Sequence, residues 1–347
     1  MSDFQELHDE LRAVARDILG EDSHKGALDW SVMEQAGWIG LEVPEEYGGA
    51  GASLAETAVI LDEIGRAAAG TAYLGGAVLS VGVLNAVQPS ALRDELLAAS
   101  AGGARRLAVA LPTGADDVPV FDYDGQQLSG RARFVPDAAG ADEILALATG
   151  PDGKPVVVHA PADAFEVTAQ PVLDETRDLS EVSASGLRGG SLLSFAGDPD
   201  AAAALILDRA RLAVACDSLG LAEAMLAATV SYAQVREQFG RPIGSFQAVK
   251  HACADMLVGI IVGRRLVAAA VDALCADSAD TRTAVLMAKA AICDSAVDIV
   301  GKAMQLHGGI GYTWESGVHV YLKRATLNRA LFGTPAAHRR QLAQRYL

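Results

Sequence analysis

The sequence is short of positive charge, of aromatic residues and of any cysteine pattern that binds metal. Among 347 residues, 44 Asp and Glu face 28 Lys and Arg, which gives a formal net charge of -16. Such a balance disfavours nucleic acid and anionic membrane surfaces as partners. The four cysteines have no zinc-ligand spacing, so we expect buried free thiols in a reducing compartment and no metal site. They are Cys216, Cys253, Cys275 and Cys293.

Long hydrophobic runs are also missing. No apolar stretch approaches the roughly 20 residues that span a bilayer, and the acidic start Met1–Glu6 is unlike a signal peptide. We therefore expect a cytoplasmic protein without a membrane segment. The chain is 51% hydrophobic but only 5% aromatic, with much alanine, and this composition favours tightly packed helices.

Three compositional zones predict three domains. Residues 1–103 have helical patterns, 104–198 carry short β-type runs separated by Gly, Pro and Asp, and 199–347 return to long helical stretches. The middle texture is typical of a small antiparallel sandwich or barrel. The long stretches favour a C-terminal four-helix bundle. We thus predict a mainly α, α+β multidomain fold.

Local signals place the element ends. In the first domain we expect helices over 4–19, 31–36, 54–68 and 75–87, with Asp29 and Ser53 as N-caps. In the last domain we expect helices over 200–238, 245–276 and 281–306, the second of them capped by Ser245. A final helix should open at Thr334, because proline follows at the first helical position. The Gly-rich stretch 186–197 is expected to close the β unit.

Two segments stand out near the bundle's expected turns. The first runs Arg236-Glu237-Gln238-Phe239-Gly240-Arg241-Pro242-Ile243-Gly244-Ser245-Phe246-Gln247, and the second runs from Gln305 to Tyr312 with Gly308, Gly309 and Gly311. Taken singly, an Arg and a Phe at a helix end are usually capping and core residues, and a Gly pair after a helix is usually a C-cap. Glycines also let a backbone approach a bulky ligand, since no Cβ intervenes.

Both segments resemble the FAD-binding signatures of the acyl-CoA dehydrogenases, a family with the same order of helices, β unit and helix bundle. The resemblance implies that Arg236 reaches the FAD pyrophosphate, as a guanidinium suits phosphate geometry. It implies that Phe239 packs at the adenine end, and that the glycine loop meets the FAD of a neighbouring subunit, hence an oligomer. The implied contacts in these two segments are Arg236, Gln238, Phe239, Gln247, Gln305, His307, Gly308 and Gly309.

A third segment, 128–137, resembles the β-domain strand that covers the flavin. Phe134 can serve as the aromatic near the isoalloxazine, and Thr334 matches a further flavin contact after the bundle's last loop. Pro136 stands where the family usually has Thr or Ser. The family's threonine-, glutamate- and serine-bearing loop is reduced here to 110–116. These departures leave the middle domain's contacts to flavin and thioester open.

The family's catalytic base is missing. In that family a carboxylate removes the α-proton of the acyl-CoA, while the β-hydrogen leaves as hydride to the flavin. The two positions known to supply the base match Phe332 and Ala210, and neither side chain accepts a proton. Asp217 lies two turns beyond Ala210, about 10 Å along the helix and on nearly the same face. Its apolar neighbours should raise its pKa towards a useful value. A catalytic and a structural Asp217 are equally compatible with the sequence.

Arg211 is expected either to orient substrate, next to a substrate-facing Phe332, or to form a structural ion pair. The leading hypothesis is an FAD-dependent acyl-CoA dehydrogenase with a displaced or absent base, similar to bacterial enzymes for bulky, steroid-type thioesters. Alternatives are a non-catalytic subunit of a heterotetrameric enzyme, or a flavin oxidase or oxygenase of the same fold. The implied partners are acyl-CoA, electron-transfer flavoprotein, and further subunits in a homotetramer or an α2β2 heterotetramer.

Overall fold

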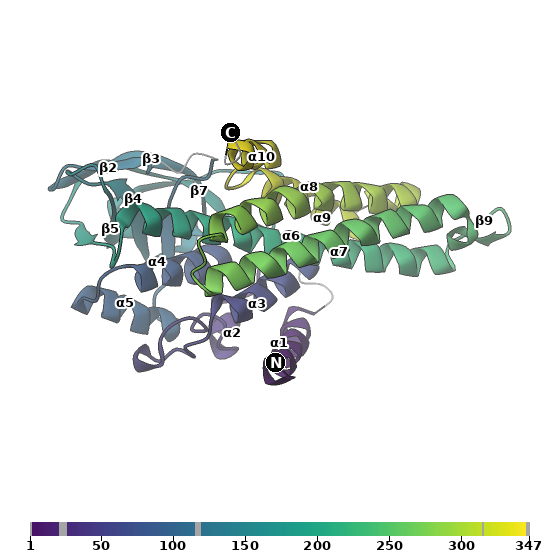
Figure 1. Cartoon of the computed structure of the whole chain (residues 1–347), viewed down its shortest axis with the longest axis horizontal. Coiled ribbons are helices and arrows are strands. Elements are labelled where there is room, and N and C mark those ends of the chain that lie inside the picture. The colour runs from purple at the N-terminus through teal and green to yellow at the C-terminus, as the bar shows by residue number, and fades with distance from the viewer. Residues whose placement is uncertain (1, 21–25, 115–118, 314–315, 345–347) are drawn as a thin grey trace.

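The computed structural model describes residues 2–20, 26–114, 119–313 and 316–344. A long helical bundle forms the body of the molecule, a β-sheet lies at one end of it, and shorter N-terminal helices pack beneath (Figure 1). The fold class predicted from the sequence is confirmed, with one difference in the sheet. One large apolar core joins the N-terminal helices to the bundle, and a smaller one fills the sheet.

The N-terminal helices are α1 (Ser2–Leu19), α2 (Trp30–Gln35), α3 (Leu54–Arg66), the π-helical turn η3 (Leu74–Leu79), α4 (Ser80–Ala86) and α5 (Ala91–Ala101). Ser53 caps α3 as expected: its Oγ accepts from Ala55 N, and Glu56 closes a capping box. Asp29 precedes α2 but makes no side-chain cap bond. Helix α5 was not predicted from the sequence.

The middle region is one eight-stranded sheet in the order β6-β7-β3-β2-β4-β5-β8, with β1 pairing on β4. Most pairs are antiparallel, as predicted, but β4 pairs parallel with both β1 and β2. The stretch 186–197 contains part of β7 and all of β8, which pairs with β5. The strands are β1 (Leu107–Ala110), β2 (Phe121–Tyr123), β3 (Gln127–Pro136), β4 (Glu143–Thr149), β5 (Pro155–Pro161), β6 (Glu166–Ala169), β7 (Leu179–Arg188) and β8 (Ser191–Leu193).

The bundle consists of α6 (Pro199–Val235), α7 (Gln247–Cys275), α8 (Thr281–His307), α9 (Val318–Ala330) and α10 (Pro335–Gln344). A two-residue hairpin, β9 (Glu237–Gln238) with β10 (Arg241–Pro242), joins α6 to α7 at the end of the bundle farthest from the sheet (Figure 1). Ser245 is not the N-cap of α7, because a 3-10 turn over Ile243–Ser245 delays the helix to Gln247. Thr334 does open α10, since its Oγ1 accepts from Ala337 N at 3.3 Å.

Helix α6 is the centre of the molecule. Among the described residues it alone is long and apolar enough to cross a membrane, but two thirds of its apolar window are buried inside the protein (67%), as for a core helix. It packs closely on α3 through two glycines. A Cβ on Gly65 would lie 2.0 Å from Asp217 O, and one on Gly220 would lie 1.9 Å from Asp62 O. Only glycine allows this approach, which fixes the position of Asp217.

Candidate functional site

The predicted site residues fall into two groups at opposite ends of the bundle. The bundle-end group surrounds the hairpin and the end of α8, and consists of Arg236, Gln238, Phe239, Gln247, Gln305, His307, Gly308 and Gly309. The base-loop group consists of Phe134 on β3, Arg211 on α6, Phe332 after α9 and Thr334 at the start of α10. Asp217 belongs to neither group.

Contacts between α6 and α8 assemble the bundle-end group. The ring of His307 stacks on Tyr232 with centroids 4.6 Å apart and planes inclined by 20°, and its Nδ1 lies 2.8 Å from Ala303 O. One turn beyond Tyr232, the N–H of Arg236 donates to Tyr232 O at 2.8 Å. The two segments singled out in the sequence therefore meet in one place, although about 70 residues separate them.

The bundle-end group is open to solvent. Phe239 has a φ of 54° and is 92% exposed, and Tyr312, at the end of the glycine loop, is 73% exposed. Arg236, Gln247 and Gln305 are exposed as well, and, chain neighbours aside, no atom of the described residues comes within 4 Å of a Cβ built on Gly308 or Gly309. Large exposed aromatics beside an exposed arginine and bare backbone suit the adenine and phosphates of a dinucleotide. This donor set fits one half of an FAD site.

The base-loop group could hold the other half. Phe134 projects from β3 at a φ of 56° and is 38% exposed; its N–H donates to Gln170 Oε1 at 2.6 Å. Thr334 is exposed at the start of α10. Next to it, Gly333 O accepts from Lys289 Nζ at 3.2 Å. Gln305 lies sixteen residues beyond Lys289 on α8, which is about 24 Å along the helix. One chain thus presents the two halves far apart.

Two buried cations hold the loop that carries Phe332. Lys289 is fully buried, and its ammonium also donates to Asn328 O at 2.7 Å, which caps the end of α9. From the other side, Arg211 Nε donates to Phe332 O at 3.2 Å, while its Nη1 lies 2.8 Å from Asp208 Oδ1. Of the two roles expected for Arg211, the structure has the ion pair. Burial lowers the pKa of Lys289.

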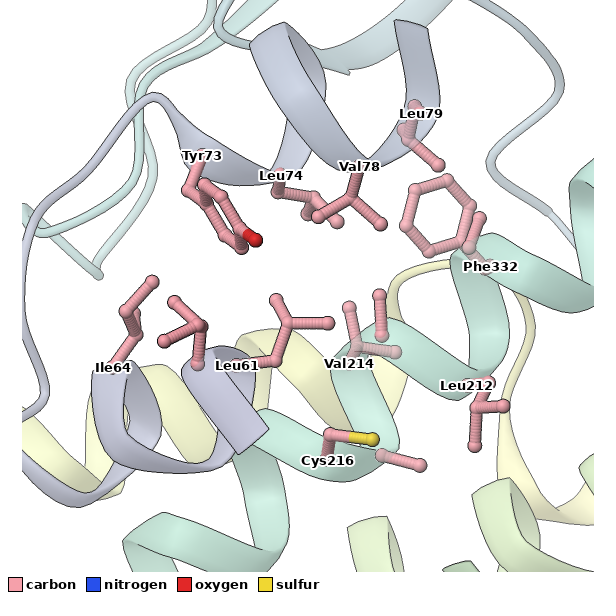
Figure 2. Close-up of a cluster of buried hydrophobic side chains, with 14 of the residues drawn as sticks. Leu61, Ile64, Tyr73, Leu74, Val78, Leu79, Leu212, Val214, Cys216 and Phe332 are labelled. Carbon is pink, nitrogen blue, oxygen red and sulfur yellow. The ribbon is translucent and has the colours of Figure 1, made fainter. Parts of the chain in front are cut away.

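Phe332 is part of the hydrophobic core. Its side chain is 0% exposed, as is Ala210 at the alternative base position. Figure 2 shows Tyr73, Leu74 and Val78 pointing across at side chains of α3 and α6, with Phe332 beside Leu79 at one end of the same layer. Phe332 has a φ of 59°, so the backbone is left-handed at this position of the loop. The expected substrate-facing orientation of Phe332 is absent from this structure.

Asp217 is a buried ion-pair partner. Its Oδ1 lies 2.5 Å from Arg324 Nη2 and 3.1 Å from Arg177 Nη2. Its Oδ2 accepts from Arg324 Nε at 3.1 Å and from Asn328 Nδ2 at 2.5 Å. Burial opposes ionisation, but the two arginines and Asn328 outweigh it and lower the pKa of Asp217. The expected rise of this pKa is wrong, because the sequence neighbours on α6 are not its electrostatic environment.

Two other carboxyl groups do have raised pKa values. Burial raises the pKa of Asp137, at the end of β3, to about 6, although its Oδ2 accepts from Gly75 N at 2.7 Å. Burial, aided by Glu223 and Glu63, raises the pKa of Asp62 on α3 to about 7. Neither residue was singled out from the sequence. The i, i+4 spacing of Arg324 and Asn328 on α9 was a readable signal that both side chains face one partner.

Comparison with known proteins identifies the family. The model of the acyl-CoA dehydrogenase N-terminal domain matches residues 5–104, and that of the C-terminal domain matches 201–347. The acyl-CoA dehydrogenase IpdE2 of Mycobacterium tuberculosis is 34% identical over 95% of this chain and 90% of its own length. The IpdE2 of Mycolicibacterium smegmatis is 31% identical over 96% and 91%.

Solved structures agree. A variant of the steroid acyl-CoA dehydrogenase Tcur3481-Tcur3483 superposes with a TM-score of 0.87 at 30% identity, over 98% of this chain and 97% of its own. The ChsE4-ChsE5 complex of M. tuberculosis gives 0.87 at 24% identity, over 98% and 96%, which shows the fold. The chain belongs to the acyl-CoA dehydrogenase family of flavoprotein oxidoreductases.

Proposed function

We propose that this chain is the subunit of an FAD-dependent acyl-CoA dehydrogenase that helps to bind FAD but does not remove the α-proton. A second chain of the same fold would supply the base. The observation that carries the proposal is the state of all three candidate base positions. Phe332 and Ala210 are apolar and fully buried, and the Asp217 carboxylate is held by two arginines and an asparagine.

A general base must reach the proton that it removes, within about 2.6–3.2 Å or through one water. The Asp217 carboxylate is 0% exposed and accepts from Arg324 and Asn328 with both oxygens. It could meet a substrate only by breaking those bonds and leaving two buried guanidinium groups without their counter-charge, which costs several kcal/mol. The geometry therefore favours a structural role for Asp217.

The bundle-end group supports the flavin-binding role. When bound, FAD supplies the acceptor for the hydride that leaves the β-carbon. In this chain, Arg236 would pair with the pyrophosphate, and Phe239 would cover the adenine end. Thr334 follows Gly333, which contacts Lys289, and about 24 Å of α8 separates Lys289 from Gln305 of the bundle-end group. This separation supports FAD sites that are shared between subunits, with the bundle-end group of one chain completing the base-loop group of another.

The substrate class rests on the relatives. One similar structure is described as a steroid acyl-CoA dehydrogenase of two chains, Tcur3481 and Tcur3483, and another is the complex of ChsE4 with ChsE5. By analogy we propose an acyl-CoA thioester with a bulky, steroid-type acyl group, and an assembly of two different chains. Electron-transfer flavoprotein would be the acceptor that reoxidises the flavin.

Co-expression tests the assembly. The chain is purified alone and with a similar acyl-CoA dehydrogenase chain encoded beside it, and flavin content and mass are measured by native mass spectrometry. We expect substoichiometric flavin for the chain alone, and an α2β2 complex with bound FAD for the pair. An Arg236→Gln chain should assemble but lose flavin. A homo-oligomer with full flavin that oxidises a steroid-type acyl-CoA by itself contradicts the proposal.

A further inference from the structure

A cavity of about 800 Å³ is lined by residues of the N-terminal region, the sheet region and α9. The loop before α2 and the α3–η3 connection form two of its walls, and the ends of the sheet strands and one side of α9 form the others. None of the residues of the bundle-end or base-loop groups lines it. Small-molecule sites have volumes of about 300–1,000 Å³, so a compact organic ligand fits. We call it the seam pocket.

The seam pocket is lined by Arg177, Arg106 and Lys323, by three exposed carboxylates, and by Asp137, a buried carboxyl group whose Oδ2 accepts from Gly75 N at 2.7 Å. Arg177 is buried with 7% of its surface exposed, and Arg106 is half-buried. By contrast, Asp29, Glu175 and Asp178 are all exposed to solvent. Exposed carboxylates are well hydrated and screened by salt, whereas a buried guanidinium is not. An entering ligand therefore meets two arginines of the β-domain beside the buried Asp137.

Arg177 has hydrogen-bonding capacity that the protein leaves unused. Its Nη2 lies 3.1 Å from Asp217 Oδ1, but Arg324 already engages both oxygens of that carboxylate. Within the described part of the chain, the buried Nε of Arg177 has no acceptor. A buried donor without a partner costs about 1–3 kcal/mol, and native proteins satisfy nearly all such groups. An oxygen atom of a ligand would satisfy this one.

Arg106 supplies the second cation. Its guanidinium lies over the ring of Trp30, 5.9 Å from the centroid, and among the described residues it has no carboxylate in ion-pair contact. Trp30 and the neighbouring Leu28 and Ala72 give the seam pocket an apolar wall. Guanidinium groups are the usual partners of carboxylates, and an indole and aliphatic wall suits a flat or cyclic hydrocarbon body.

We propose that the seam pocket binds a small organic carboxylate, with its oxygens at Arg177 and Arg106 and its hydrocarbon part against Trp30. The ligand touches the loop before α2, the sheet and α9 at once, so its binding stabilises the contact between the three domains. The proposal does not depend on whether this chain supplies a base, because neither Phe332 nor any other residue of the bundle-end or base-loop groups lines the seam pocket.

The probe is 4-fluorobenzoate, followed by ¹⁹F NMR line width on the purified full-length protein, with the neutral 4-fluorobenzamide as the matched control. The carboxylate should broaden at millimolar concentration and the amide should not. Arg106→Gln should raise the dissociation constant of the carboxylate about tenfold or more, since it removes a charge-assisted hydrogen bond. Arg131→Gln, on the exposed face of β3, should leave it unchanged.

Arg106→Gln is preferred to Arg177→Gln, because Arg177 also supports Asp217 and its loss tests folding as well as binding. Added FAD should not displace the probe. Equal broadening of acid and amide, no binding at millimolar concentration, an unchanged affinity in Arg106→Gln, or displacement by FAD would each overturn the proposal.

Discussion

The two ends of the bundle differ in the exposure of the residues that the sequence matches to functional positions of the family. At the hairpin end, the predicted cofactor-binding residues Arg236, Phe239 and Gln305 are all exposed. At the sheet end, Phe332 and Ala210, which the sequence matches to the two base positions, are both fully buried in the apolar core. The first region is open to a ligand or to a second chain, whereas the second is filled by the protein's own side chains.

The loop that carries Phe332 is held through its backbone. Lys289 and Arg211 donate to its carbonyl oxygens, and Phe332 has a left-handed φ of 59°. These contacts involve the backbone, so they do not depend on the side chain at position 332. The loop therefore supports the core and places Thr334, while proton transfer is left to another subunit in our proposal.

Asp217→Asn should produce the largest loss of stability. The substitution keeps the shape but leaves Arg324 and Arg177 without their shared counter-charge, so the free energy of unfolding should fall by about 3–5 kcal/mol. Urea denaturation measures it. Glu181→Gln, whose partner Arg133 is exposed, is the control and should cost less than about 1 kcal/mol. A stable Asp217→Asn protein would mean that the buried network is not needed for folding.

Phe332→Ala should cost about 3–5 kcal/mol, because a fully buried aromatic ring is removed from a packed layer. Phe239→Ala is the matched control at the other end. Since Phe239 is 92% exposed, its loss should change the free energy of unfolding by no more than about 0.5 kcal/mol. A similar loss of unfolding free energy in the two variants would contradict the difference between a buried Phe332 and an exposed Phe239.

Arg236→Ala should lower the affinity for FAD without lowering the free energy of unfolding. Loss of a charge-assisted contact to pyrophosphate should weaken FAD binding by about 1.5–3 kcal/mol, or roughly ten- to a hundredfold, while the unfolding free energy without flavin stays the same. Fluorescence titration with FAD on the assembled protein measures the affinity. Arg188→Ala, an exposed arginine of the β-domain, serves as control. If Arg236→Ala binds FAD as tightly as the wild type, the bundle-end group is not a cofactor site.

The titration of Asp62 should give the smallest effect, a gradual change of the free energy of unfolding with pH. Its pKa is raised from 3.8 to about 7 in the folded protein, so the folded state binds the proton more tightly than the unfolded state. Stability is then highest when Asp62 is protonated, and declines by at most about 1.4 kcal/mol per pH unit between about pH 4 and 7. Asp62→Asn should flatten this part of the profile relative to wild type. Parallel profiles for the two proteins would contradict it.

Local signals in the sequence predicted local structure well. The Ser53 capping box and the opening of α10 at Thr334 depend on residues three positions apart. Ser245 was misjudged because a tight turn, in which its Oγ donates to Pro242 O, competes with capping. Helix α9 was missed since its inner face carries Arg324 and Asn328 in place of an apolar stripe.

The environment of Asp217 could not be predicted in the same way. Its neighbours along α6 are small or apolar, which suggested a desolvated carboxyl group with a raised pKa. The charges that reverse the shift come from Arg324 and Arg177, which are 107 and 40 residues away along the chain. Such pairings depend on how α9 and the β-domain pack against α6, and a helical period on one segment carries no information about them.

The exchange of the substrate's α-proton tests the central claim most directly, because it reports the base and not the flavin. The purified chain, with FAD in excess, is incubated anaerobically in D₂O with a steroid-type acyl-CoA, and deuterium at the α-carbon is followed by mass spectrometry. We predict exchange no faster than in buffer for this chain alone, and rapid exchange once the partner chain is added. Rapid exchange by the chain alone that is lost in Asp217→Asn would contradict the account and make Asp217 the base.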